Sequence, residues 1–348
     1  MSIAGGVVDV RTFGAAGTGA VSDSAAFQRA FDFMSAKNYS RMELSNGTYL
    51  IDSSLRLPGA SVDSGQPARF VINGNGAEII VSGSNVGFNR DYTDVSEYTD
   101  RVWVPTFRDI NFTGSSAGIA IKHWGSASLS IESCSFNGFG TAVHIGDAIC
   151  PQIKSCSFLD CTNSLVATEL TGQAASATAD NSLVSMLSVS NCRVTCSDIS
   201  AVGFSLVGCR SARLESCIVG GSNCNKAFSA VEGSGSEVSA RLTDCWADSF
   251  TSIQGSAIEL SGSVAMFVID GFRVPAYNHV TIDASGLARS VVRVENCAGL
   301  DLGSFTDGAA NNHWIFDGNI LSTTHFSDSG MWNGDVPLLI SERTLNHV

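Results

Sequence analysis

Apolar and polar positions alternate along most of the chain in short runs, and one six-residue pattern recurs among them. It consists of an apolar residue, a polar residue, then Ser, Asn or Asp, then a small or apolar residue that is usually Cys, any residue, and usually another apolar one. The residues at its fourth position are 110, 134, 156, 192, 217, 245, 271 and 297, so successive copies lie 22 to 36 residues apart. Self-similarity at such a period is typical of repeat proteins.

Period-two runs around these copies, such as residues 127–134, 211–217 and 257–260, predict two or three short strands per repeat. The repeats are shorter than propeller blades, which need about 40 to 45 residues. We therefore expect an all-β chain, a right-handed parallel β-helix. Its coils stack equivalent positions, so the repeat cysteines should form a buried internal ladder rather than redox or metal sites. They are Cys134, Cys156, Cys192, Cys217, Cys245 and Cys297.

Residues 22–37 carry the one convincing helical pattern, with Ser22 or Asp23 as N-cap and apolar residues at positions 27, 30, 31 and 34. A helix here can close the open end of the β-helix, where strand edges would otherwise be unpaired. The expected organisation is an N-terminal segment with the capping helix at 1–40 and a β-helix at 41–300. Residues 301–348 should form a C-terminal cap or trimerisation segment.

The charge balance excludes some classes of binding partner. Among 348 residues there are 20 Lys and Arg against 33 Asp and Glu, a net charge of -13, so the chain should repel nucleic acid and acidic membrane surfaces. Apolar runs of the length that spans a bilayer do not occur, and the first residues lack a basic segment followed by an apolar stretch. We expect the chain to be made in a cytosol, and we expect no insertion into a membrane.

Three segments near the N-terminus resemble a known family. They are Phe13-Gly14-Ala15-Ala16-Gly17-Thr18-Gly19, Asp23-Ser24-Ala25-Ala26-Phe27-Gln28-Arg29-Ala30-Phe31 and Gly47-Thr48-Tyr49-Leu50-Ile51. Together they are similar to the N-terminal signature of pectate-lyase-like right-handed β-helix proteins, which include bacteriophage tailspikes. Thr18, Ser22 and Ser24 replace the usual Asp, Asp and Thr of that signature. The resemblance covers about the first 80 residues by motif and specifies fold rather than activity.

Unpaired cysteines, acidic charge and no secretion signal favour, within this family, a virion protein over a secreted plant-cell-wall enzyme. The resemblance then implies a homotrimer in a phage tail, made in the bacterial host cytoplasm and acting at the bacterial cell surface. Its expected partners are a bacterial surface polysaccharide, either O-antigen or capsule, and other phage tail proteins.

Cleavage of a sugar chain needs two carboxyl groups, about 5 to 5.5 Å apart for retention or 6.5 to 9.5 Å for inversion. Stacked coils supply such distances, because neighbouring parallel strands are about 4.8 Å apart. Asp244 and Asp270 both precede a ladder residue on consecutive coils and are the first candidates. Trp246 and Phe272 follow the same ladder positions and are expected to face outward as a sugar platform. Alternatively, the acids cap strand-end turns and the aromatics, with Ile218 and Ile269, form a subunit interface.

Two further carboxylate pairs are candidates. The long repeat holds extra residues between Glu169 and Asp180, which could wall a groove or form a plain surface loop. Glu259 and Asp283 should face outward on consecutive coils, as catalytic acids or as solvated charges. No cofactor is expected, and no metal site, although a cation-dependent lyase would need Ca²⁺.

The sequence therefore favours a tailspike that binds and hydrolyses a bacterial surface polysaccharide. Two alternatives share the fold: a non-catalytic receptor-binding or structural spike, and a cation-dependent polysaccharide lyase. Paired acids beside an aromatic residue would favour hydrolysis, acids with Lys or Arg around calcium would favour a lyase, and a groove without paired acids would favour binding alone.

Overall fold

The structure is a computed structural model of the 348-residue chain. It describes residues 6–37, 39–58, 69–90, 102–169, 183–233, 238–248, 252–253, 256–263, 265–273, 282–300, 305–307, 312–317, 320–321 and 339–340. The chain divides into unit 1, residues 1–166 and 170–184, and unit 2, residues 167–169 and 185–348. Among the described residues no helix is long and apolar enough to cross a membrane.

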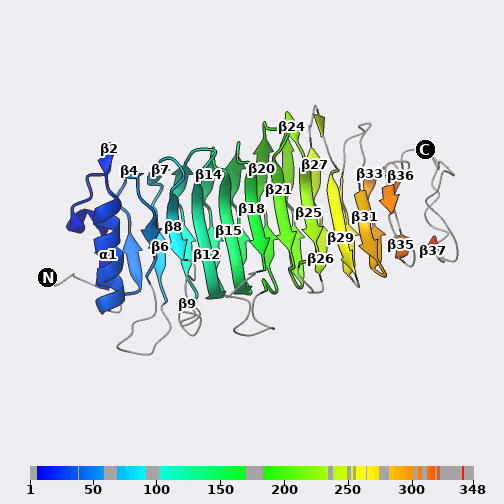
Figure 1. Ribbon diagram of the computed structural model, residues 1–348, viewed down its shortest axis with the longest axis horizontal. Helices are drawn as coiled ribbons and strands as arrows, with labels where there is room; N and C mark the ends of the chain where they lie inside the picture. Colours follow the sequence, from blue (N-terminus) through cyan, green and yellow to red (C-terminus); the bar gives the residue numbers. More distant parts are fainter. Residues whose placement is uncertain are drawn as a thin grey trace. The chain divides into compact units, whose positions relative to one another are not determined.

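Each unit is a parallel β-helix, as predicted, in which most coils contribute one strand to each of three parallel sheets (Figure 1). We name the sheets A, B and C in the order in which the chain enters them. In unit 1, sheet A contains β1 (Val7–Asp9), β3 (Arg41–Glu43), β6 (Val71–Asn73), β10 (Thr106–Arg108), β13 (Ser130–Glu132) and β16 (Gln152–Lys154). Sheet B contains β2 (Thr18–Ser22), β4 (Thr48–Ile51), β7 (Glu78–Val81), β11 (Asn111–Thr113), β14 (Ser135–Asn137) and β17 (Ser157–Leu159). Sheet C contains β5 (Leu55–Arg56), β8 (Val86–Arg90), β12 (Ile119–Ala127), β15 (Thr141–Ile149) and β18 (Asn163–Thr168), and β9 (Val102–Trp103) pairs with β12.

Unit 2 repeats this order. Its sheet A contains β19 (Ser188–Ser190), β22 (Ala212–Glu215), β26 (Ser239–Thr243), β30 (Met266–Asp270), β32 (Val291–Glu295), β35 (His313–Asp317) and β37 (Leu339–Ile340). Sheet B contains β20 (Arg193–Cys196), β23 (Ile218–Gly221) and β27 (Trp246–Asp248), and sheet C contains β21 (Val202–Val207), β25 (Lys226–Val231), β29 (Ile258–Ser263), β31 (Ile282–Ala288) and β34 (Phe305–Asp307). Two further parallel pairs are β24 (Asn223–Cys224) with β28 (Ser252–Ile253) and β33 (Ala298–Leu300) with β36 (Ile320–Leu321).

The coil pattern continues past Cys297 into the predicted C-terminal segment. Strand β35 pairs with β32 in parallel, and Trp314 is buried opposite Val292. The sequence pattern fades here because no cysteine marks this coil, although the backbone ladder persists. Residues 322–338 and 341–348 lie outside the described residues, so their predicted role in assembly stays a prediction.

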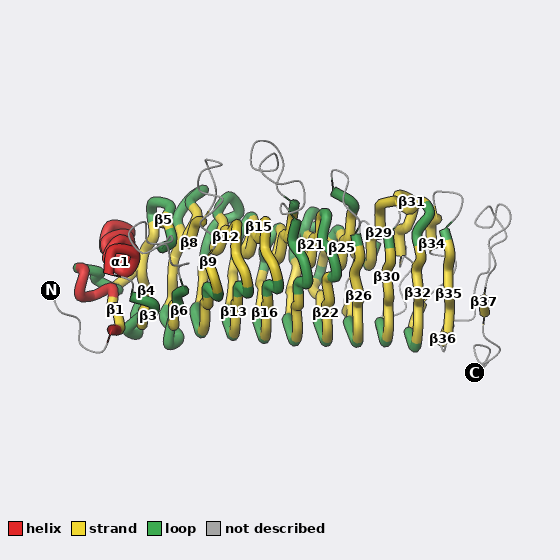
Figure 2. The backbone as a smooth tube through the Cα atoms, turned by 90° about the horizontal axis from the view of Figure 1, so that it is seen from below, coloured by secondary structure: helices red, strands yellow, loops and turns green. Residues whose placement is uncertain are grey.

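A helix α1 (Ser24–Lys37) lies beside β1 and the 3-10 turn η2 (Val10–Phe13) in unit 1 (Figure 2). Phe27, Ala30, Phe31 and Met34 are buried, which confirms the predicted apolar face. Asp23 precedes the helix and is 1% exposed. Its carboxylate accepts hydrogen bonds from the N–H groups of Ala16 and Leu50, at 2.6 and 3.3 Å, and so joins the three segments of the N-terminal motif.

The predicted cysteine ladder is present within each unit. In sheet A of unit 2, Ser190 pairs with Glu215 and Glu215 with Thr243, so the cysteines two residues further on stack in register. Glu132 and Lys154 pair in the same way in unit 1, ahead of Cys134 and Cys156. All six ladder cysteines are free thiols that are at most 2% exposed, which confirms that they belong to the core.

His123 is an isolated polar group in the core of unit 1. It is fully buried, its ring centroid lies 6.5 Å from that of Phe107, and neither ring nitrogen has a hydrogen-bond partner. Burial lowers the pKa of His123 to about 3, and the charge of Arg90 acts in the same direction. The folded chain therefore holds this imidazole neutral at pH values where an unfolded chain would protonate it.

We predict that this histidine makes unit 1 less stable in mild acid. The unfolded state binds a proton below about pH 6.5 and the folded state only near pH 3, so stability is lost as pH falls through that window. Between pH 7 and 4.5 the loss from this one group is about 2 to 3 kcal/mol. The His123→Leu variant should lose correspondingly less stability in urea unfolding at the two pH values. Equal losses in the variant and the parent would contradict the assignment.

Candidate functional site

One turn recurs at the end of the sheet A strands that carry the sequence pattern and explains the polar third position of that pattern. In unit 2 it passes through a single residue with positive φ on each coil, and we call these residues the A–B turn. Their φ values are 53° at Asn191, 53° at Ser216, 50° at Asp244, 68° at Gly271 and 51° at Asn296. Left-handed backbone favours Gly, Asn and Asp. Asp244 is thus, first of all, a residue that tolerates this turn.

The backbone of the turn links each coil to the next. The N–H of Asp244 donates to the carbonyl oxygen of Asp270 at 2.9 Å, and the N–H of Gly271 donates to that of Glu295 at 2.9 Å. Because every coil makes the same bond, the end of sheet A stays in strict register. The side chains that flank the turn are therefore stacked at the coil spacing of about 4.8 Å.

This register corrects the predicted place of Phe272. Thr243 pairs with Asp270 and Asp270 with Glu295, so Phe272, and not Gly271, occupies the ladder position between Cys245 and Cys297. The ring is fully buried and packs edge-on against Phe228, with ring centroids 5.6 Å apart. Phe272 cannot contact a ligand outside the coil. Ile269, expected in an outward interface, is 1% exposed and also belongs to the core.

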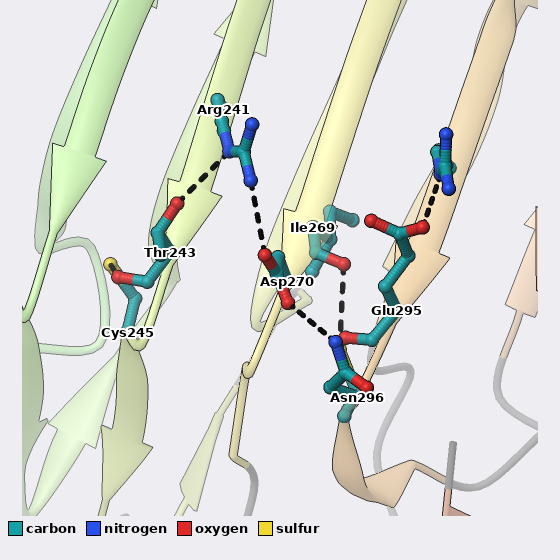
Figure 3. A network of polar contacts seen from close by, with 9 residues as sticks. Arg241, Thr243, Cys245, Ile269, Asp270, Glu295 and Asn296 are labelled. Carbon is teal, nitrogen blue, oxygen red and sulfur yellow. Dashed lines mark hydrogen bonds and ion pairs between the residues drawn. The ribbon is translucent and has the colours of Figure 1, made fainter. Parts of the chain in front are cut away.

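Asp270 lies at the centre of a polar network on the outer face of sheet A (Figure 3). Its register partner is Glu295 on the following coil, not Asp244. Arg241 Nη2 donates to Asp270 Oδ2 at 3.1 Å and Asn296 Nδ2 donates to Oδ1 at 3.0 Å. Arg293 forms an ion pair with Glu295. Two carboxylates one coil apart thus lie side by side, each with a cationic or amide donor.

Asp244 nevertheless reaches the same place from the preceding coil. Its side chain is exposed, and a Cβ added at Gly271 would lie 2.5 Å from Asp244 Oδ1, so this oxygen lies directly over Gly271. Gly271 follows Asp270 in the chain. Asp270 and Glu295 are thus register partners, and Asp244 lies at the turn on the coil before them. We call these three residues, from three successive coils, the acidic corner.

Trp246 begins sheet B just beyond the A–B turn, and it is 37% exposed. The guanidinium carbon of Arg273, on the next coil, lies 5.0 Å from the ring centroid. Ile218 is the register partner of Trp246 on the preceding coil. The expected outward aromatic is therefore present, with an arginine that sequence analysis did not single out.

Glu259 and Asp283 are direct register partners on sheet C of unit 2. Glu259 forms an ion pair with Lys226 and accepts a hydrogen bond from Ser229 Oγ at 2.6 Å. Asp283 Oδ1 accepts a hydrogen bond from the N–H of Ser285 at 3.0 Å. The pair lies on a different sheet from the acidic corner, and no exposed aromatic residue among those described lies in its column.

Glu169 is 7% exposed, and Asp180 lies outside the described residues. The N–H groups of Glu169, Gly208 and Glu232 each donate to the strand of the following coil, which places these three residues at equivalent positions. The Glu169 side chain extends past the coil of Gly208 to Gly233 on the coil after it, because a Cβ added at Gly233 would lie 2.3 Å from Glu169 Cδ. Burial raises the pKa of the Cys209 thiol to about 12, and the charge of Glu169 acts in the same direction. Glu232, the acid that stacks with Glu169, was missed.

Sequence analysis missed three residues at this site: Arg241 and Asn296, which donate to Asp270, and Arg273, which lies over Trp246. An offset of 29 residues from Arg241 to Asp270 and of 26 from Asp270 to Asn296 becomes a contact only once the register is known. Within the part of the chain that the structure describes, no group of three or more His, Cys, Asp and Glu side chains is arranged to hold a metal ion.

Three solved structures place the fold among known proteins. ORF18 of Geobacillus virus E2 is similar with a TM-score of 0.57 and 16% identity, over 90% of this chain and 61% of that one. A mutant tailspike protein of E. coli bacteriophage HK620, in complex with a pentasaccharide, has a TM-score of 0.57 and 14% identity, over 92% of this chain and 67% of that one. The A-module of an Azotobacter vinelandii mannuronan C-5 epimerase has a TM-score of 0.53 and 12% identity, over 90% of this chain and 95% of that one.

These identities establish a shared fold, and the chain spans 61% of the length of the Geobacillus virus protein. A search of curated proteins by sequence found no match. The family described as rhamnogalacturonase A/epimerase, pectate lyase-like, matches residues 7–220, which include the N-terminal motif and most of the cysteine ladder. The parallel β-helix, the capping helix and this match together show that the chain belongs to the pectate-lyase-like rhamnogalacturonase A/epimerase family.

Proposed function

We propose that the chain binds a bacterial surface polysaccharide and hydrolyses it at the acidic corner, as part of a phage tailspike. The observation that carries the proposal is the gathering of Asp244, Asp270 and Glu295 from successive coils beside the exposed Trp246. The fold is shared with the tailspike of phage HK620, which was solved with a pentasaccharide. That similarity supports the substrate class, and the residues support the chemistry.

The spacing of the acids suits glycoside hydrolysis. Asp270 and Glu295 are register partners on neighbouring coils, which are about 4.8 Å apart, close to the roughly 5 to 5.5 Å between the carboxyl groups of retaining enzymes. Arg241 and Asn296 compensate the negative charge of Asp270, which fits the group that attacks or stabilises the positive charge at the sugar carbon. Asp244 is exposed, and none of the described residues donates to its carboxylate, which fits the proton-transfer group.

Trp246 offers a sugar-stacking surface next to these acids. An aromatic face packs against the apolar face of a sugar ring, and Arg273 can donate hydrogen bonds to hydroxyl or carboxylate oxygens. Trp246 follows Asp244 by two residues. A polysaccharide that binds along sheet B with one sugar on Trp246 would therefore place a neighbouring sugar at the acidic corner. The platform and the acids thus form one continuous surface in the proposal.

The ion pairs favour a second function, a spike that binds polysaccharide without cleaving it. Arg241 and Arg293 bond Asp270 and Glu295 as ordinary surface ion pairs do along a ladder of coils. On this alternative the acids hold coils together and only Trp246 with its neighbours contacts sugar. Charge-removing substitutions separate the two functions.

We predict that Asp270→Asn and Asp244→Asn each lower polysaccharide cleavage by about 10² to 10⁴-fold, since each removes a group that moves a proton or meets developing charge. The matched controls come from unit 1. Glu132→Gln removes a carboxylate bonded to Arg108 on the same sheet, and Asp109→Asn changes a turn residue whose φ is also positive, at 53°. Both controls should cleave at the parent rate in a reducing-end assay. Parental cleavage rates in all four variants would contradict the assignment of Asp244 and Asp270, and a parent chain that releases no reducing ends would favour binding without cleavage.

Removal of the Trp246 ring should weaken polysaccharide binding more than it slows polysaccharide cleavage. Trp246→Ala should lower the affinity for intact polysaccharide by about tenfold to a hundredfold, on the scale of a lost stacking contact of about 1.5 to 3 kcal/mol. Ile218→Ala, one coil earlier in the same column, is the control and should change affinity little. Binding is measured by surface plasmon resonance on immobilised polysaccharide. A larger effect at Ile218 than at Trp246 would indicate a different contact surface.

Assembly is the last part of the proposal. We propose a homotrimer carried in the virion tail alongside other tail proteins, made in the host cytoplasm and acting at the bacterial cell surface. Trimer formation should depend on the C-terminal segment predicted at 301–348. Truncation after Leu321 keeps β35 and β36 and removes 322–348, so it separates assembly from the coil core. Light scattering should show a monomer, and a stable trimer of the truncated chain would contradict the prediction.

A further inference from the structure

Three thiols form a continuous stack in the core of unit 2. Cys192, Cys217 and Cys245 each follow by two residues a position that pairs in register on sheet A. Cys217 Sγ lies 3.6 Å from the carbonyl oxygen of Val189, and Cys245 Sγ lies 3.5 Å from that of Leu214. Each of these two side chains thus points back toward the preceding coil in the same way, so the sulfurs lie above one another.

The stack brings the sulfurs within reach of each other. Cys217 lies between Cys192 on the preceding coil and Cys245 on the following coil, at equivalent positions of the register. Coils spaced by about 4.8 Å also place the Cα atoms within the range of about 4.4 to 6.8 Å that disulfides span. All three are free thiols, and they are 0 to 1% exposed.

Phe272 ends the stack. It occupies the next ladder position and separates Cys245 from Cys297 by two coils, or roughly 9.6 Å. That distance exceeds the limit of about 7 Å beyond which cysteines cannot be bridged without backbone movement. Cys297 therefore has the same burial and the same ladder position as the others but no cysteine neighbour on the adjacent coil within unit 2.

We propose that the Cys192–Cys217–Cys245 stack is an oxidation site, in which a small two-electron oxidant joins Cys217 to one of its two neighbours. The bond closes across adjacent coils inside the core. Cys217 is the shared partner, so one link forms within this stack and the third of its cysteines stays a thiol. The inference is independent of the polysaccharide-binding function.

The chemistry balances with diamide as the oxidant. The Cys217 thiolate attacks the N=N bond of diamide, and the neighbouring thiolate then attacks the Cys217 sulfur and displaces the reduced reagent. The two thiols lose two electrons and two protons in total, and diamide takes up both as the hydrazine. Since the partner thiol lies at the equivalent position of the adjacent coil, the second step needs no further reagent in the core.

The test is oxidation of the folded full-length chain with diamide, followed by denaturation, blocking of the remaining thiols and non-reducing mass spectrometry. We expect a link between the tryptic peptide 214–226, which carries Cys217 and Cys224, and either 242–273 with Cys245 or 155–193 with Cys156, Cys161 and Cys192. Fragmentation of the linked peptides should place the bond at Cys217 and at Cys245 or Cys192. The link should raise the melting temperature of the oxidised chain by several degrees, since it restrains the unfolded state.

Single cysteine variants identify which cysteines form the link. Cys217→Ser should abolish the link, whereas Cys245→Ser should divert it to Cys192 and leave its yield unchanged. Cys297→Ser is the matched control and should behave as the parent. A link that persists in Cys217→Ser, that joins Cys297, or that fails to form in the folded parent under conditions that oxidise the unfolded chain would overturn the proposal. The Cys245→Ser result keeps the test decisive even if Cys217→Ser folds poorly.

Discussion

The in-register parallel backbone ladder is the constraint on which the rest of this structure depends. Each coil bonds to the next through the same carbonyl and N–H groups, so equivalent residues of neighbouring coils lie about 4.8 Å apart. Each side chain in such a column therefore lies next to its counterparts on the neighbouring coils. A buried column must be filled by side chains that stack, and an outer column must be filled by side chains whose charges tolerate each other.

The inner columns follow this rule with small or flat groups. Cysteines stack in the ladder of each unit, and Phe112, Phe136 and Phe158 stack in sheet B of unit 1 with centroids 5.1 and 5.0 Å apart. In the outer columns, neighbouring side chains compensate each other's charge. Arg241, for example, lies opposite Val268 in register, and its guanidinium reaches the carboxylate of Asp270. At the acidic corner the rule stacks Asp270 on Glu295, and arginine and asparagine donors compensate the charge of these two acids.

The sequence predicted the coil and its cysteine ladder because a buried cysteine at a fixed place in each repeat is a strong and local signal. The same reasoning misplaced Phe272 by one position. It aligned Gly271 with the cysteines, whereas the left-handed turn residue at each coil is the one that must be Gly, Asn, Asp or Ser. The buried position that follows accepts Cys or Phe alike, so burial alone could not reveal the offset. Pairings such as Arg241 with Asp270 depend on the register to a single residue and cannot be obtained from spacing.

The central claim is that this family member cleaves a polysaccharide by hydrolysis at carboxylates stacked on neighbouring coils. Incubation of the full chain with purified host surface polysaccharide tests it most directly, with new reducing ends and unsaturated sugar products measured in the same sample. Hydrolysis predicts new reducing ends without unsaturated products. Unsaturated products would identify a lyase, and intact polysaccharide that stays bound to the protein would identify a spike that recognises its receptor without cleaving it.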